Sequence, residues 1–266
     1  MRFTVLVENE RGETALEAEH GISLWIETGD TRVLFDTGAS SAFAENAAVL
    51  GVPLETADAL VLSHAHADHT GGLHTFFARN ASAPVFVGPG IDTPRYAVDG
   101  DRRRAIGIDA DFLGEHADRF REVSDSVELA PGVGVSRILR RPHPVPKGND
   151  RLLREQHGRL ERDPFEEELF LWVVESDGVR VVTGCSHSGI ANIVDAAGAY
   201  GSVHAVIGGF HLKDEEESIL REVARMLSGV GSIYTGHCTG RRGYEFLRGR
   251  LGPRVRYAST GTRATV

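Results

Sequence analysis

The chain has 266 residues, of which 41% are hydrophobic and 25% are charged, and its formal net charge at pH 7 is −9. A chain of this length can bury a substantial core on its own, so a metal ion or a disulfide framework is not needed to hold the fold together. The acidic balance argues against a nucleic-acid-binding surface. The only two cysteines, Cys185 and Cys238, lie far apart in the sequence and suit a reducing compartment.

We expect neither a membrane span nor an export signal. The first residues, MRFTVLVENE, contain no long apolar run of the signal-peptide type, and no stretch approaches the roughly 20 apolar residues of a membrane span. We therefore expect a cytoplasmic protein whose partner is a small molecule, not a nucleic acid or a membrane.

Short apolar runs alternate with helical patterns along the chain. Strands are predicted at residues 3–7, 22–28, 31–36, 57–63 and 83–88, and again at 168–176, 179–184, 203–209 and 232–236. Helices are predicted at 40–50, 71–80, 189–200, 214–228 and 240–250. The pattern in both halves predicts an α/β fold in which two packed sheets are flanked by helices.

The middle of the chain is different in composition. Residues 88–167 are richer in Pro, Gly, Arg and Asp and have poor periodicity. We expect them to form an elaborated insertion over one face of a single domain that spans residues 1–266.

Polar residues with ligand chemistry follow several of the predicted strands directly. They are Asp36, His64, Cys185, His187, His211 and His237. Open α/β architectures gather their ligand sites at the carboxyl ends of strands, so we expect these residues to converge in the folded protein.

The stretch HAHADH carries four potential metal ligands, His64, His66, Asp68 and His69. Two alternating imidazoles can point at one ion while the other two side chains project to another side, which favours two divalent metal ions. Each ion then needs a further protein ligand, and His187 and His237 are the best-placed candidates. We expect zinc, with manganese, iron or nickel as alternatives.

At these residues the sequence resembles the metallo-β-lactamase superfamily. SHAHADH is similar to its HxHxDH signature, VLFDTG to its first motif and YTGH to its last histidine motif. Taken together, VEN, AEHGISLWIET, TGCSHSGI, IGGFHL and TGHCTG resemble one subgroup. That subgroup includes an archaeal dihydropterin-(ribofuranosyl)aminobenzene 5′-phosphate synthase and related metal-dependent hydrolases. The resemblance implies an αββα four-layer sandwich with the metals at one edge.

The resemblance also implies a role for each candidate residue. It implies one metal on His64, His66 and His187, and the other on Asp68, His69 and His237. Asp36 would accept an imidazole N–H behind the first histidines and fix its tautomer. Cys185 stands where many members carry a bridging aspartate, which makes it a possible ligand. Asp68 and His211 are the candidate catalytic residues.

Alternatives remain open for several residues. His143 is a rival to His187, and His211 a rival to His237. The histidines at 20, 74, 116, 157 and 204 are expected to be structural or exposed. Glu166, Glu167 and Glu168 are expected to form a solvated run, with one of them facing the metal edge as the alternative. The arginine groups at 102–104 and 140–141 are expected to be solvated, with phosphate recognition as the alternative.

Three functions fit this pattern. The first is a hydrolase that attacks a phosphoester or other small ester with a metal-bound hydroxide. The second is a transferase that condenses a dihydropterin pyrophosphate with a ribofuranosylaminobenzene phosphate. The third is a non-catalytic metal-binding regulator.

Overall fold

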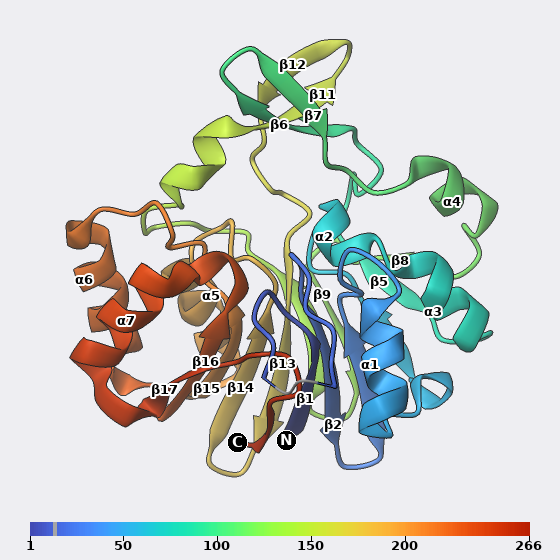
Figure 1. The fold of residues 1–266 in the computed structure, drawn as a ribbon. Helices are drawn as coiled ribbons and strands as arrows, with labels where there is room; N and C mark the ends of the chain where they lie inside the picture. The colour runs from blue at the N-terminus through green and yellow to red at the C-terminus, as the bar shows by residue number, and fades with distance from the viewer. Residues whose placement is uncertain (13–14) are drawn as a thin grey trace.

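The computed structural model describes residues 1–12 and 15–266 as two large sheets packed face to face, with helices on both outer sides (Figure 1). The strands of the first sheet, in spatial order, are β18 (Arg263–Thr265), β1 (Arg2–Val7), β2 (Ser23–Thr28), β3 (Thr31–Phe35), β4 (Ala59–Val61), β5 (Val85–Val87) and β8 (Phe120–Glu122). The strands from β18 to β3 are antiparallel, and those from β3 to β8 are parallel.

The second sheet repeats this mixture of strand directions. Its strands, in spatial order, are β17 (Val255–Tyr257), β16 (Ser232–Gly236), β15 (Val203–Gly209), β14 (Gly178–Thr183), β13 (Leu169–Glu175), β10 (Val133–Arg137) and β9 (Ser126–Ala130). Strands β14 to β17 are parallel. The carboxyl ends of these strands therefore lie together at one edge.

Three apolar layers hold the sandwich together. The central layer, between the two sheets, contains fully buried side chains from both, such as Phe3 and Ile207. A second layer packs helices α1 (Ala42–Leu50) and α3 (Leu73–Arg79) against the first sheet through Phe43 and Phe76. The third layer packs α5 (Ile190–Ala197), α6 (Glu217–Met226) and α7 (Gly240–Leu251) on the second sheet. The order of layers is αββα, which confirms the predicted fold class.

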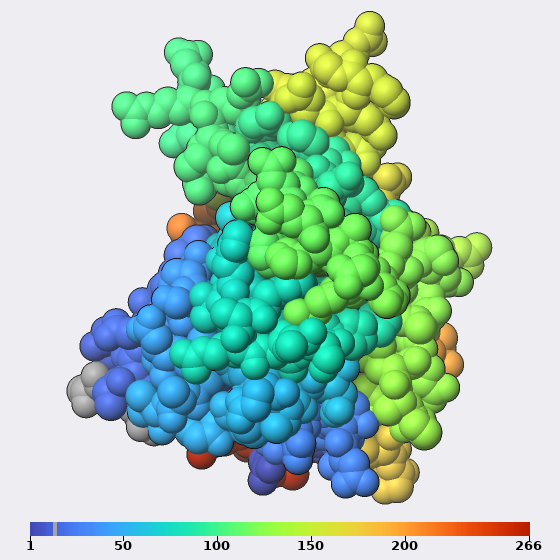
Figure 2. Space-filling model, turned by 90° about the vertical axis from the view of Figure 1, so that its right-hand side faces the viewer, coloured from blue at the N-terminus to red at the C-terminus, as the bar shows by residue number. Residues whose placement is uncertain are grey.

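A third, four-stranded sheet stands over the edge of the sandwich. It consists of β12 (Arg159–Arg162), β11 (Leu152–Gln156), β6 (Arg95–Asp99) and β7 (Arg102–Ala105), and it projects from the body of the molecule (Figure 2). These strands carry many charged residues and little hydrophobic alternation, so the sequence pattern did not predict them. The segment 88–167 is thus divided, because β8, β9 and β10 belong to the two large sheets.

The remaining helices are short. They are α2 (Ala67–Thr70), α4 (Ala110–Glu115) and the 3-10 turns Leu54–Thr56, Lys147–Arg151, Gly198–Tyr200, Leu227–Gly229, His237–Thr239 and Gly252–Arg254. Within the described residues, none of the helices has the length and apolar character needed to cross a bilayer.

Candidate metal centre

The loops and short helical turns that carry the candidate ligands lie at the edge where strands of both large sheets end, beneath the third sheet (Figure 1). The loop after β4 carries His64 and His66 and leads into α2, which holds Asp68 and His69. From the second sheet, His187 follows β14 and His237 follows β16. The fold thus brings together side chains from both halves of the chain.

The first group of side chains contains His64, His66 and His187. Their ring centroids are 4.5 Å apart for His64 and His66, 4.8 Å for His64 and His187, and 5.0 Å for His66 and His187. All three residues are buried. Phe165 stacks on the His187 ring with a centroid distance of 3.9 Å and fixes its plane.

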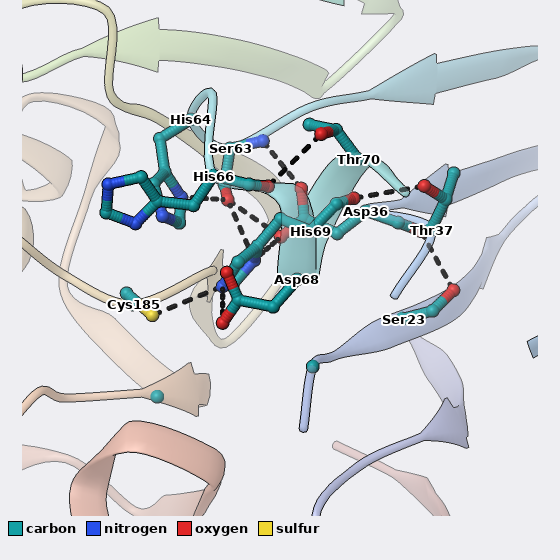
Figure 3. A network of polar contacts seen from close by, with 12 residues as sticks. Ser23, Asp36, Thr37, Ser63, His64, His66, Asp68, His69, Thr70 and Cys185 are labelled. Atoms are coloured by element: carbon teal, nitrogen blue, oxygen red, sulfur yellow. Dashed lines mark hydrogen bonds and ion pairs between the residues drawn. The ribbon is translucent and has the colours of Figure 1, made fainter. Parts of the chain in front are cut away.

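The second group contains Asp68, His69 and His237. One carboxylate oxygen of Asp68 lies 3.7 Å from Nε2 of His69 and 3.5 Å from Nε2 of His237. Cys185 Sγ lies 3.2 Å from Nε2 of His69, and Figure 3 shows the thiol facing that imidazole. The donor atom of Cys185 is within 4.8 Å of ligand atoms in both groups, so the cysteine lies between them.

Asp36 supports the second group. Its carboxylate lies 2.7 Å from Nδ1 of His69, and it also accepts hydrogen bonds from the backbone N–H and the hydroxyl of Ser63 (Figure 3). Contact with the first pair of histidines is indirect, through the Ser63 hydroxyl, which lies 2.9 Å from Nδ1 of His64. Asp36 therefore contacts the imidazole of His69 directly, and not that of His64 or His66. The reason is that α2 turns the His69 ring back towards the end of β3, where Asp36 lies.

The imidazoles of His187 and His237 are also held through Nδ1, in each case by an asparagine. Nδ1 of His187 lies 2.8 Å from the amide oxygen of Asn149, and Nδ1 of His237 lies 2.7 Å from that of Asn9. An amide oxygen only accepts, so each Nδ1 carries the hydrogen and each Nε2 keeps a free lone pair. This is the tautomer in which Nε2 ligates a metal.

Two buried glutamates fix the backbone around the site. Glu168 accepts hydrogen bonds of 2.6 Å from the backbone N–H groups of His187 and Ser188. Glu8 accepts from the backbone N–H groups of Glu10 and His237. Glu167 and Glu168 are each 1% exposed, so the expectation of a solvated run is wrong for both, while Glu166 is exposed.

Backbone strain is concentrated at this edge. Five non-glycine residues at or next to the site have positive φ: Asp36, Phe165, Ser186, His211 and His237. A backbone conformation of this kind costs free energy and persists only where the surrounding contacts hold it in place. Such conformations cluster at functional sites.

The electrostatics keep most of these imidazoles neutral. Burial lowers the pKa of His66 to about 3 and holds the pKa values of His64 and His187 well below their usual range. Burial also disfavours charge on His69, but the carboxylates of Asp36 and Asp68 outweigh it and raise its pKa to about 9. Neutral imidazole is the form that binds a cation, and the two carboxylates beside His69 make that position attractive to positive charge.

The donor set fits a metal centre. Buried polar atoms normally have hydrogen-bond partners. Here a set of buried ring nitrogens has none among the described residues: Nε2 of His64, His66, His187 and His237, and Nδ1 of His211. Imidazole, carboxylate and thiolate donors together suit zinc and other divalent transition metals. Coordination by a metal would satisfy all of these nitrogens.

A cleft of about 750 Å³ gives access to these donors. Its floor includes His66, Asp68 and His187, and its walls include Arg102, Arg104, Arg151 and Lys213. The third sheet forms one wall, so a molecule that reaches the donors lies against β6 and β7.

The structure places the alternative ligands His143 and His211 differently from His187 and His237. His143 lies 3.7 Å from Glu222 and belongs to none of the metal-binding groups found among the described residues. His237 lies beside Asp68, whereas His211 groups with Cys185 and Cys238.

Several residues at the site were missed or misplaced by the sequence reasoning. His20 is exposed as expected, yet its Nε2 lies 3.4 Å from Asp68. Cys238, Asn9 and Asn149 were not predicted as site residues, and Glu168 was predicted only as one of three glutamates of which one could face the metal edge. Cys238 could have been found from its position next to His237. Asn149 lies in a stretch without regular pattern.

Fold and site together define a class, the αββα sandwich proteins with a histidine-rich candidate metal centre at the edge of the sheets. The family model of the metallo-beta-lactamase superfamily matches residues 18–193, and the chain belongs to this superfamily.

Relatives and solved structures agree with this assignment. The chain is 32% identical over 246 residues to the 7,8-dihydropterin-6-methyl-4-(beta-D-ribofuranosyl)-aminobenzene-5′-phosphate synthase of Methanocaldococcus jannaschii, covering 84% of this chain and 82% of the synthase. The crystal structure of Tm1679, described as a metal-dependent hydrolase of the beta-lactamase superfamily, superposes with a TM-score of 0.86 at 27% identity and covers 100% of this chain and 99% of that one. Zinc-bound PqqB of Methylobacterium extorquens, at 14% identity, a TM-score of 0.63 and 100% coverage of both chains, shares the fold.

Proposed function

We propose that this protein is a metal-dependent hydrolase that cleaves a phosphoester or another ester of a small phosphorylated molecule at a centre of two divalent cations, most simply zinc. The observation that carries the proposal is the convergence of free, buried imidazole nitrogens on the floor of an open cleft. Two bound cations lower the pKa of a water molecule and polarise the oxygen of the bond to be broken.

In this proposal His64, His66 and His187 hold one cation, and Asp68, His69 and His237 hold the other. Cys185 lies between the two groups, within reach of both. The hydrogen bonds that Asp36, Asn149 and Asn9 accept keep the imidazoles oriented while the substrate is bound and released.

Asp68 also orients the attacking water. Burial disfavours its charge, but the neighbouring imidazoles of His69 and His237 hold the pKa of its carboxyl well below its usual range. The carboxylate therefore stays a hydrogen-bond acceptor at neutral pH. His20, beside Asp68 at the mouth of the cleft, is placed to contact the substrate.

The walls of the cleft suit a phosphorylated substrate. Arg102 and Arg104 are exposed on β7, and neither they nor Lys213 forms an ion pair with another described residue. Arg151 is paired with Asp214 at 2.7 Å. Unpaired cations around a cleft of a protein whose net charge is −9 favour an anionic ligand.

A second candidate is the transferase reaction, in which an aminobenzene ring attacks a dihydropterin pyrophosphate and pyrophosphate leaves. The observation that favours it is the 32% identity to the M. jannaschii synthase over most of both chains. The same cations and the same cleft walls would hold the pyrophosphate.

The experiment that tests both combines metal counting with two assays. Purified protein is analysed for zinc, manganese, iron and nickel, and then assayed on bis(p-nitrophenyl) phosphate and p-nitrophenyl phosphate, with His66→Ala as the inactive control. A parallel assay supplies dihydropterin pyrophosphate with and without ribofuranosylaminobenzene phosphate. Two ions per chain with release of p-nitrophenol supports the hydrolase. Pyrophosphate release that requires the aminobenzene supports the transferase, and an absence of bound metal after reconstitution contradicts both.

A further inference from the structure

A third group of metal-binding side chains lies next to the two groups described above. It consists of Cys185, His211 and Cys238, which follow the three adjacent parallel strands β14, β15 and β16. Their donor atoms all lie within 4.8 Å of one another. Neighbouring parallel strands deliver residues to the same edge, so this grouping follows from the sheet order.

The group is held together by close packing. The backbone N–H of His211 lies 3.3 Å from Sγ of Cys238, and that sulfur lies 3.5 Å from the carbonyl oxygen of Cys185. A β-carbon at Gly209 would lie only 2.6 Å from the same sulfur. The absence of a side chain at Gly209 therefore allows the Cys238 thiol to reach over the end of β15.

His211 provides an independent indication of a ligand. Its Nδ1 is buried and has no hydrogen-bond partner among the described residues. The residue is held in the left-handed region with φ of 49°, a conformation that costs free energy for a histidine. The fold thus maintains a strained backbone that places an unpartnered imidazole nitrogen next to two thiols.

We propose that Cys185, His211 and Cys238 form a thiolate-rich metal subsite that extends the proposed centre and takes a soft divalent cation such as zinc. Three protein donors leave a fourth tetrahedral position open, and the cleft reaches all three residues. Two thiolates and an imidazole select zinc or another thiophilic ion over magnesium, calcium or manganese. Cys185 is shared with the histidine groups, so a cation here lies beside the ions that they hold.

The test uses the full-length protein loaded with cobalt(II), which replaces zinc and reports each thiolate ligand by charge-transfer absorption in the near ultraviolet. If both cysteines ligate the cation, the Cys238→Ser variant should lose about half of this absorption. The His211→Gln variant should bind cobalt more weakly. His204→Gln, a change of a half-buried histidine outside the groups, is the control and leaves the spectrum unchanged.

The inference rests on the metal centre proposed above, and the experiment separates the two. Cobalt that binds without any change of the charge-transfer band in Cys238→Ser overturns the thiolate subsite and leaves the histidine centre standing. A wild-type protein that binds no cobalt overturns both.

A second measurement needs no variant, in case a substitution prevents folding. X-ray absorption of the zinc-loaded wild-type protein counts sulfur neighbours at the metal, about 2.3 Å away for a thiolate. Sulfur from both cysteines supports the subsite, and sulfur from one cysteine or none contradicts it.

Discussion

The Asp36 carboxylate lies 2.7 Å from Nδ1 of His69, and both side chains are completely buried. This contact joins the end of β3 to α2 and leaves Nε2 of His69 directed at the candidate metal position. Supporting carboxylates of this kind fix the orientation of a ligating imidazole and increase its basicity.

We predict that Asp36→Asn weakens zinc binding by roughly 10–100-fold. An amide has one acceptor oxygen, so it cannot accept from both the Ser63 backbone N–H and Nδ1 of His69. Zinc affinity is measured by competition with a chromophoric chelator. The control is Asp58→Asn. The Asp58 carboxylate accepts a hydrogen bond from the Arg32 backbone N–H and lies away from the cleft. Equal affinities of the Asp36 variant and the wild-type protein would contradict a supporting role for Asp36.

His66→Ala is expected to remove the cation held by His64, His66 and His187, and activity with it. The fold should remain, because the three apolar layers do not depend on the ion. Metal content and turnover are measured alongside urea unfolding, and the variant should unfold within about 1 kcal/mol of metal-free wild-type protein. Global unfolding of the variant would mean that the metal is structural.

The walls of the cleft provide a matched pair of charge changes. Strand alternation places Arg102 and Arg104 on one face of β7, whereas Arg103 lies over the ring of Tyr96 at 4.6 Å. Arg102→Ala and Arg104→Ala should each raise KM for a phosphorylated substrate by roughly 3–10-fold and change kcat much less, because the lost contact is made equally in the ground and transition states.

Steady-state kinetics of the three arginine variants at two salt concentrations check this prediction. Arg103→Ala should behave like the wild-type protein. An equal rise of KM in all three variants would show that the effect comes from net charge and not from the wall of the cleft.

Glu167 makes stability depend on pH. Burial, partly offset by the Arg95 guanidinium 2.9 Å away, raises the pKa of the Glu167 carboxyl from 4.5 to about 7. Between these two values the folded protein binds more protons than the unfolded chain. The free energy of unfolding contributed by this group therefore falls as pH rises through this window.

Glu167→Gln should remove this decline, so that the variant is more stable than the wild-type protein at pH 8 by roughly 1–3 kcal/mol and similar to it at pH 5. Urea unfolding at both pH values measures the difference. Glu166→Gln, a change at an exposed neighbour, should keep the wild-type slope. A Glu167 variant with the wild-type pH dependence would show that the carboxyl is ionised throughout this range.

The strands and helices of the sandwich were predictable because their signals are local. Residues 31–36 contain the apolar run VLF and residues 203–209 contain AVI, and these segments form β3 and β15. The strands β7 and β12 of the third sheet, RRRA and RLER, are exposed along their whole length. They have no buried face, so no hydrophobic alternation could predict them.

The sequence by itself determined the αββα class and the residue types at the ends of the strands, since HAHADH and the apolar runs each lie within a few consecutive positions. Only the tertiary structure decided which side chains meet. It placed Asp36 against His69, buried Glu167 and Glu168, and brought Cys238 next to Cys185 and His211. These contacts join residues far apart in the chain. They depend on the order of strands in the sheets and on the turns that follow them, which a linear pattern of hydrophobicity does not encode.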